Sequence, residues 1–304
     1  MSQRDVKGRI SSVKNIEKIT RAMEMVAAAR LRRAEQRISA LRPYAGAIRR
    51  MTRQAAEAAG SEASSLPILA EHESEKKVGL LLVTGDRGLA GAFNSQIIRA
   101  GSRAAAEHES EGRELAWYAS GRRGVSSLTF RGHTMSGGYT GFTDRPAYAD
   151  ARGIADDLMT AYIDGDIDRV EIFYNGYVSP LTQEVRRETL LPLQHATVLE
   201  ADDEQDPDDE DDQAQPEHRA LVEYEPGPEA ILERLIPDYV EISIYRALLE
   251  STASEHGARM TAMRNASENA GELIEDLTLE MNRARQAEIT QEIMEVVAGA
   301  ESLT

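Results

Sequence analysis

The sequence contains no cysteine, which excludes disulfide bonds and metal sites with cysteine ligands. It also lacks a long apolar run: the longest, from Val78 to Val83, spans about six residues, whereas a membrane-spanning helix needs roughly 18. The opening residues, MSQRDVKGRI, are charged from Arg4 onward and show no apolar stretch of the secretory kind. From these absences we expect a protein of the cytoplasm, or one that is peripheral to a membrane.

Lysine is scarce, because the chain has 30 arginines but only five lysines, and its formal net charge is -17. An acidic, lysine-poor composition favours a cytoplasm of very high salt, where the Debye length falls to about 3 Å and repulsion between carboxylates is screened. The charge is uneven: residues 1–53 carry a net +10 and residues 238–304 a net -8. Residues 200–212, EADDEQDPDDEDD, hold ten acids in thirteen positions, and we expect a disordered insertion over 200–218.

Both ends of the chain predict long helices. Apolar residues recur at steps of three and four in residues 1–59 (Val6, Ile10, Val13, Ile16, Ile19, Met23 and Val26) and again toward the C-terminus (Met263, Ala266, Ala270, Ile274, Leu277, Met281 and Ala284). We expect Pro43 to kink the first helix, and Pro237 to start the last one or to break it. At 1.5 Å per residue each would be on the order of 80–90 Å long.

Two such helices of opposite charge are most simply explained as an antiparallel coiled coil formed by residues 1–59 and the helical region 219–304. The alternative is two independent helices packed on a globular core. Residues 76–199 lie between them and alternate strand-like and helix-like segments. This order predicts an inserted α/β sandwich with mostly parallel strands, the last two forming a hairpin.

The stretch VTGDRGLAGAFN, residues 83–94, follows an apolar strand and leads into a helix, as phosphate-binding loops do. Its glycine spacing matches neither the dinucleotide nor the P-loop pattern, and Asp86 would repel a phosphate. We therefore favour a tight turn, and keep as the alternative a small-molecule-binding enzyme that uses the loop Gly85–Gly91.

Other chemistry is weakly indicated. The six histidines show no metal-ligand spacing, His256 is expected to be solvated or packed, and the many carboxylates are expected to form solvated faces. We expect no catalytic residue, no metal and no cofactor. The basic N-terminal helix suggests a nucleic-acid binder as a third possibility, but no aromatic residues are interleaved with its charges and the whole chain is acidic.

Several blocks resemble the gamma subunit of F-type ATP synthases, the central rotor stalk. They are RISSVKNIEKITRAMEMVAAARLRRA (9–34), DRGLAGAFN (86–94), YEPGPEAILERLIPDYVE (224–241), ESTASEHGARMTAMRNASENA (250–270) and NRARQAEITQEIMEVVAGAES (282–302). Alanine stands at position 90, where the family usually has cysteine. The acidic tract falls outside the resemblance.

The resemblance implies that the middle block is a Rossmann-like domain without a catalytic nucleotide. It also implies a non-catalytic shaft that couples proton-driven rotation of the membrane ring to ATP synthesis. The implied partners are the hexamer of three alpha and three beta subunits, the epsilon subunit and the membrane c-ring. The implied location is the cytoplasmic face of the cell inner membrane, bound through the complex only.

Individual roles follow from the same resemblance. Arg285 and Gln286 match positions that hydrogen-bond acidic loops of the beta subunit, and Met23 would lie on the opposing helix near that level. The last turns would form a bearing, through Ile293, Val296, Val297 and Leu303. Tyr224 and Glu225 match positions that contact the c-ring.

Overall fold

The computed structural model describes residues 3–60, 66–70, 72, 74–193, 225 and 227–301. The chain divides into two units: Met1–Ala29 together with Arg259–Thr304, and Arg30–Ala258. We call them unit 1 and unit 2. None of the helices in the described residues is long and apolar enough to cross a membrane. The expected insertion 200–218 lies outside the described residues.

Two long helices contribute to both units: α1 (Gln3–Ala59) has 57 residues and α6 (Pro228–Glu301) has 74. The expected helix start or break at Pro237 is wrong, because α6 begins at Pro228 and continues through Pro237. Proline suits the first position of a helix, where its missing N–H costs nothing. At Pro237 the lost hydrogen bond is offset by burial of the neighbouring Ile236 and Val240. Helix α1 likewise continues through Pro43.

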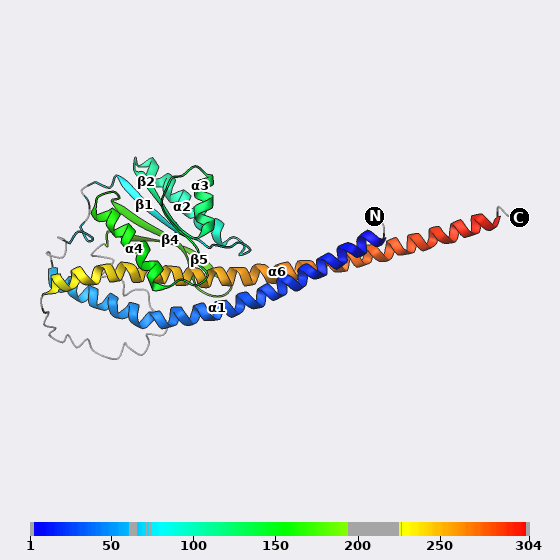
Figure 1. The fold of residues 1–304 in the computed structure, drawn as a ribbon, viewed down its shortest axis with the longest axis horizontal. Coiled ribbons are helices and arrows are strands. Elements are labelled where there is room, and N and C mark those ends of the chain that lie inside the picture. Colours follow the sequence, from blue (N-terminus) through cyan, green and yellow to red (C-terminus); the bar gives the residue numbers. More distant parts are fainter. Residues whose placement is uncertain are drawn as a thin grey trace. The chain divides into compact units, whose positions relative to one another are not determined.

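In unit 1 the two helices pair in antiparallel orientation, as predicted (Figure 1). Val6 and Ile10 share a buried cluster with Leu277. Further along α1, the Thr20 hydroxyl lies 2.7 Å from the Ser267 hydroxyl, and Arg264 Nε donates to Glu24 at 2.9 Å. The residue numbers of the contacts on α6 decrease as the residue numbers on α1 increase, so the two helices run in opposite directions.

The buried seam differs from the predicted apolar stripe. In α1 one series of buried and half-buried positions follows steps of four and three and includes polar residues: Val6, Ile10, Val13, Glu17, Thr20, Glu24 and Ala27. Met23 of the predicted stripe is also half-buried. Ile16, Ile19 and Val26, which the sequence placed in the stripe, are more than half exposed. A strict heptad repeat keeps one line of contact between two helices, and these three isoleucine and valine residues fall off that line.

Unit 2 contains a five-stranded sheet with the order β3-β2-β1-β4-β5. The strands are β1 (Lys77–Val83), β2 (Glu114–Ser120), β3 (Met135–Tyr139), β4 (Arg169–Tyr177) and β5 (Gln183–Leu191). The first four are parallel, and β5 is antiparallel to β4, which confirms the predicted hairpin. The helices are α2 (Phe93–Ser110), α3 (Arg122–Phe130) and α4 (Tyr148–Ile163). The sequence did not reveal α3 and β3, which are short and have little apolar periodicity.

Both faces of the sheet are covered, because side chains alternate along a strand. On one face Leu80 and Leu82 of β1 pack with Ile97 of α2. On the other, Leu81 packs in a cluster with α4 and with the inner parts of α1 and α6, represented by Leu158, Ala55 and Leu232 (Figure 1). These parts of α1 and α6 therefore belong to the core of unit 2.

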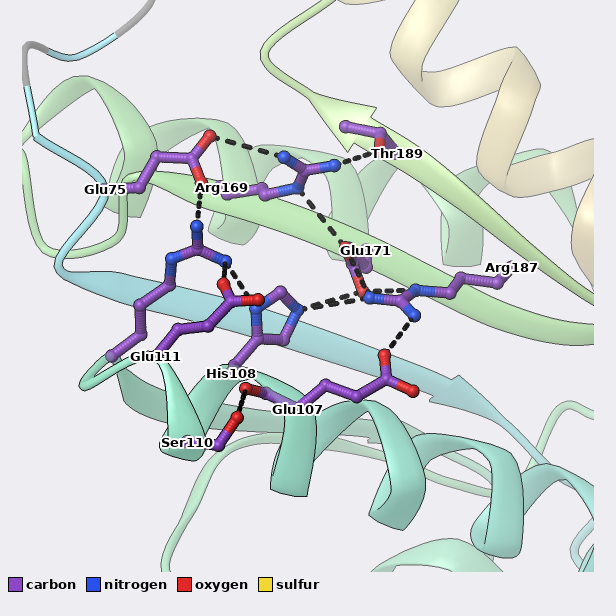
Figure 2. A network of polar contacts seen from close by, with 10 residues as sticks. Glu75, Glu107, His108, Ser110, Glu111, Arg169, Glu171, Arg187 and Thr189 are labelled. Atoms are coloured by element: carbon purple, nitrogen blue, oxygen red, sulfur yellow. Dashed lines mark hydrogen bonds and ion pairs between the residues drawn. The ribbon is translucent and has the colours of Figure 1, made fainter.

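A polar network joins α2, β4 and β5 (Figure 2). Glu171 of β4 is 2 % exposed and accepts two hydrogen bonds from Arg187 of β5, at 2.9 and 3.1 Å. His108 of α2 places its Nε2 atom 3.3 Å from the same carboxylate. Arg113 Nη1 lies 2.8 Å from His108 Nδ1, and arginine only donates, so Nε2 carries the imidazole proton toward Glu171. The expectation that the carboxylates are solvated is therefore wrong for Glu171.

The Glu171→Gln substitution tests this network. Burial alone would raise the pKa of Glu171, but the hydrogen bonds and charge of Arg187, together with the hydrogen bond from His108, hold it below its usual value. The carboxylate then stabilises the fold above about pH 4, and this contribution is lost as the pH falls through the folded-state pKa. We expect Glu171→Gln to lower the free energy of unfolding by about 3 kcal/mol at pH 7, because Arg187 loses its buried partner.

This difference should shrink when urea unfolding is repeated below about pH 4. The exposed Glu109→Gln, on the same helix as His108, is the matched control and should change stability by about 0.5 kcal/mol or less. A difference between Glu171→Gln and the unsubstituted chain that does not depend on pH contradicts the assigned role.

Candidate functional site

The glycine-containing loop between β1 and α2 directs its polar groups to its own chain. The Thr84 hydroxyl donates to the Ser120 carbonyl and accepts from the Gly124 N–H, each at 2.8 Å. The Gly85 N–H donates to Asn94 Oδ1, also at 2.8 Å. A phosphate-binding loop leaves such donors for the ligand. Here the Gly85 N–H and the Gly124 N–H are already used.

Asp86 occupies the position where an anion would bind. Its carboxylate accepts from the N–H of Arg122, the first residue of α3, and from Gly141, both at 2.9 Å, and from the Thr143 hydroxyl at 3.0 Å. Burial would raise the pKa of Asp86, but these hydrogen bonds hold it below its usual value. The N-terminus of α3 is thus neutralised by a carboxylate of the loop itself.

Glu255 of α6 closes the loop from another side. A Cβ atom built on Gly85 would meet the Glu255 carboxyl group at 2.7 Å, and Glu255 is buried. Among the described residues, no group of three histidine, cysteine or acidic side chains could hold a metal ion. The loop therefore joins the α/β domain to α6, and this geometry disfavours a nucleotide site there.

Three further contacts join the long helices to the α/β domain within unit 2. Arg30 of α1 hydrogen-bonds Asp144, whose Oδ1 lies 3.7 Å from Nε2 of the buried His256 of α6. Tyr177 of β4 donates to Glu35 of α1. The packed role expected as one option for His256 is confirmed. Sequence reasoning missed Arg30 and Glu35, because their partners are more than a hundred positions away and carry no local signal.

The structure does not bring Met23 near Arg285 and Gln286. Met23 is half-buried beside the contact between Glu24 and Arg264, whereas Arg285 and Gln286 are exposed on α6. Arg285 follows Arg264 by about 20 positions, which corresponds to about 30 Å along the helix. The expectation of one common level is therefore wrong, because the seam fixes the register of α1 against α6.

The last part of α6 lies beyond its contact with α1. The apolar cluster of unit 1 ends at Met281, and α6 continues past the first residues of α1 (Figure 1). From Arg285 to Ala298 every described side chain is exposed, and Val296 reaches 72 %. The exposed large apolar residues there are Ile289, Ile293, Met294, Val296 and Val297. A series of apolar side chains left in water is typical of a surface that a partner covers.

The remaining predicted site residues are less well placed. Leu303 and Tyr224 lie outside the described residues, and Glu225 is exposed. Of the predicted bearing residues, the structure therefore describes Ile293, Val296 and Val297. Of the two predicted ring-contact residues, it describes Glu225.

Comparisons with known proteins point to one family. The sequence profile described as ATP synthase matches residues 2–303. The ATP synthase gamma chain of Streptomyces avermitilis is 43% identical over 302 residues, which cover 98% of this chain and 94% of that protein. The ATP synthase gamma chain of Moorella thermoacetica is 44% identical over 300 residues, which cover 99% and 98%.

Solved structures agree. A chain from the central stalk and c-ring of the Tetrahymena thermophila mitochondrial ATP synthase superposes with a TM-score of 0.58 at 26% identity, covering 82% of this chain and 99% of that one. A chain of the Euglena gracilis mitochondrial ATP synthase gives a TM-score of 0.68 at 18% identity, covering 99% and 94%. At 18% identity, the similarity to the Euglena gracilis chain shows a shared fold.

The contact between Gly85 and Glu255 can be tested by Gly85→Ala. The added methyl group would overlap a buried carboxylate, so we expect the free energy of unfolding to fall by about 1–3 kcal/mol. Gly153→Ala in α4 is the matched control, because nothing lies within 4 Å of its added methyl group and alanine favours a helix. Equal stability of the two variants in urea unfolding would show that α6 does not pack on the loop.

Proposed function

Because this chain belongs to the ATP synthase gamma chain family, and is thus the central-stalk subunit of an ATP synthase, we propose that it is the shaft that couples ion-driven rotation to ATP synthesis. Rotation of the membrane ring would turn the chain inside a hexamer of alpha and beta subunits that holds the catalytic sites. The observation that carries the proposal is the antiparallel pairing of α1 and α6 in unit 1, with the end of α6 extending beyond it.

A paired shaft of this kind acts by population shift. Three equivalent beta subunits meet different sides of one asymmetric shaft, so each rotational angle favours a different conformation at each catalytic site. Unit 1 is asymmetric in charge as well as in shape. Residues 3–29 of α1 carry six basic and three acidic side chains, whereas residues 268–280 of α6 carry five acidic and no basic ones. Such a surface presents a different electrostatic contact to each neighbour.

Specific contacts are assigned on this basis. Arg285 and Gln286 would hydrogen-bond acidic loops of a beta subunit, because both are exposed and a charge-assisted bond is strong but reversible. Ile293, Val296 and Val297 would turn in an apolar sleeve that covers their exposed side chains. Ile16, Ile19 and Val26 of α1 are exposed in the same way and offer further contact surface, with Met23 at a separate level of the shaft.

The other partners would be the epsilon subunit and the membrane c-ring, the latter meeting Tyr224 and Glu225. The chain would be held at the cytoplasmic face of the inner membrane by the complex alone. The small-molecule enzyme alternative finds no support, because two backbone donors of the Gly85–Gly91 loop that it would need, the N–H groups of Gly85 and Asp86, donate to the side chains of Asn94 and Thr143. The third possibility, a nucleic-acid binder, has no further support.

The coupling role predicts a specific defect for Arg285→Ala in the assembled complex. Loss of a charge-assisted hydrogen bond worth about 1.5–3 kcal/mol should lower proton-driven ATP synthesis about tenfold. The matched control is Arg283→Ala, which removes an exposed arginine from a different side of the same helix turn and should leave synthesis within about twofold.

Both variants should co-purify with the nucleotide-binding hexamer at one chain per hexamer, which separates a coupling defect from failed assembly. Deletion of residues 285–304 should weaken coupling or assembly further. Full proton-driven synthesis by a complex with this deletion would refute the shaft mechanism.

The proposed high-salt habitat predicts salt-dependent stability. Because 52 acidic residues face 35 basic ones, self-repulsion should be strong at low salt and screened in molar KCl. We expect the melting temperature of the chain to rise by several degrees between about 0.1 M and 2 M KCl. Circular dichroism measures this directly, and an unchanged melting temperature would remove the high-salt interpretation.

A further inference from the structure

One side of α2 and α3 points away from the core of unit 2. Ile97 of α2 and Leu128 of α3 are buried against the sheet in one apolar cluster. The inner parts of α1 and α6 belong to the cluster on the other face of the sheet (Figure 1). Within unit 2, the long helices therefore leave the outer side of α2 and α3 open to a partner.

Phe130 lies on this outer side, at the end of α3. Its side chain is 93 % exposed, the largest value among the large apolar residues that the structure describes. Leu128, two positions earlier, is buried, and residues two apart point to nearly opposite sides of a helix. Isolated exposed apolar residues are common, but an aromatic side chain can bury about 150–250 Å², and aromatic residues are enriched at the centres of protein interfaces.

The surface around Phe130 is basic, although the chain as a whole is acidic. Residues 93–106, which form most of α2, and residues 121–134, which contain α3, hold five arginines and no acidic residue. The formal net charge of the chain is -17. The surface of α2 and α3 therefore attracts anionic groups that most of the chain repels.

Three of these arginines lie close to the end of α3. Arg99 and Arg103 of α2 are exposed and four positions apart, so they share one side of that helix. Arg131, next to Phe130, donates to the hydroxyl group of Ser102 at 3.1 Å, which brings the end of α3 beside these two arginines. We call Phe130, Arg99, Arg103 and Arg131 the α2–α3 patch.

Carboxylates fit the guanidinium groups of this patch. A guanidinium group binds a carboxylate through two parallel hydrogen bonds and is more weakly hydrated than an ammonium group. Arg131 gives one N–H group to Ser102 and keeps its other donors for a partner. Phe130 beside them fits an apolar pocket. An acidic protein segment that also carries apolar residues satisfies both requirements.

Nucleic acid and anionic lipid fit the patch less well. Single-stranded nucleic acid is held by several aromatic side chains on which successive bases stack, whereas α2 and α3 together present one exposed aromatic residue, Phe130. Nucleic acids and anionic membranes also carry negative charge over a large area, which a net charge of -17 repels. A protein segment can place a few carboxylates at the patch alone.

We propose that the α2–α3 patch binds an acidic segment of a partner protein. Phe130 is the apolar anchor of this contact, and Arg99, Arg103 and Arg131 pair with carboxylates around it. The patch lies wholly in unit 2, so its binding does not depend on the shaft mechanism. Salt weakens the contact, because the Debye length shrinks from about 10 Å at 0.1 M to about 3 Å at 1 M.

The single tryptophan of the chain allows a local measurement in the full-length protein. Trp117 is 3 % exposed, so the indole group added by Phe130→Trp reports on the patch. The probe is a synthetic helical peptide of alanine, leucine and glutamate, with the glutamates along one side. At about 0.1 M KCl it should shift the emission to shorter wavelength in a saturable way. A reference peptide with glutamine in place of glutamate should bind about tenfold more weakly.

Neutralising the patch supplies the comparison. In the Phe130→Trp background, changing the three arginines of the patch to Gln should weaken binding of the glutamate peptide about tenfold. The matched control changes Arg32, Arg33 and Arg145 to Gln, which are exposed elsewhere in unit 2, and alters the net charge equally. It should keep the affinity within about twofold. In the otherwise unsubstituted chain, Phe130→Ala should weaken binding of a fluorescent glutamate peptide about tenfold.

Equal affinities of the patch variant and the control variant overturn the proposal, as does the lack of a saturable shift with the glutamate peptide. Tighter binding of single-stranded oligothymidylate or of phosphatidylglycerol vesicles, titrated in the same way, would assign the patch to nucleic acid or lipid and also overturns it. If circular dichroism shows that the patch variant is unfolded, Phe130→Ala decides, and an unchanged affinity of that variant overturns the proposal.

Discussion

The seam between α1 and α6 in unit 1 is the constraint on which the pairing of the two long helices depends. A helix with an uncovered apolar stripe is marginal in water, and each helix covers the stripe of the other. The seam repeats at steps of four and three on both helices, and the buried pair Thr20 and Ser267 satisfy each other within it. A buried polar pair of this kind favours one register of the two helices over shifted registers, since any shift would break the hydrogen bond between the two hydroxyl groups.

The first loop of the α/β domain resembles a phosphate-binding turn, but backbone donors around it are used within the chain. This loop has the position and the glycines of a phosphate-binding turn, but Asn94 and Asp86 take the N–H groups of Gly85 and Arg122. Glu255 of α6 lies against Gly85 at a distance that leaves no room for even a methyl group. The same donors that bind phosphate in other proteins here hold the domain together, and the packing of Glu255 on Gly85 holds the loop against α6.

Exposure in unit 1 follows from the same seam. A narrow line of contact buries one position in three or four, so Ile16, Ile19 and Val26 remain in water although they are apolar. The apolar cluster that joins the two helices ends at Met281, and beyond it Ile293, Val296 and Val297 are exposed together. Apolar surface of this extent is expected in a subunit that works inside an assembly and is covered there by its partners.

The sequence by itself determined the opposite charges of the two terminal segments, which follow from composition alone. It also determined the two terminal helices and the mostly parallel α/β domain between them, because these depend on local repeats of three, four or two residues. The tertiary structure decided which side of each helix is buried, since the length of a repeat does not specify which of its residues face the partner helix. It buried Thr20 and left Ile16 exposed, drew Glu171 into a salt bridge with Arg187, and placed Met23 at a different level of unit 1 from Arg285. These outcomes depend on partners that are distant in sequence, and no local pattern carries that information.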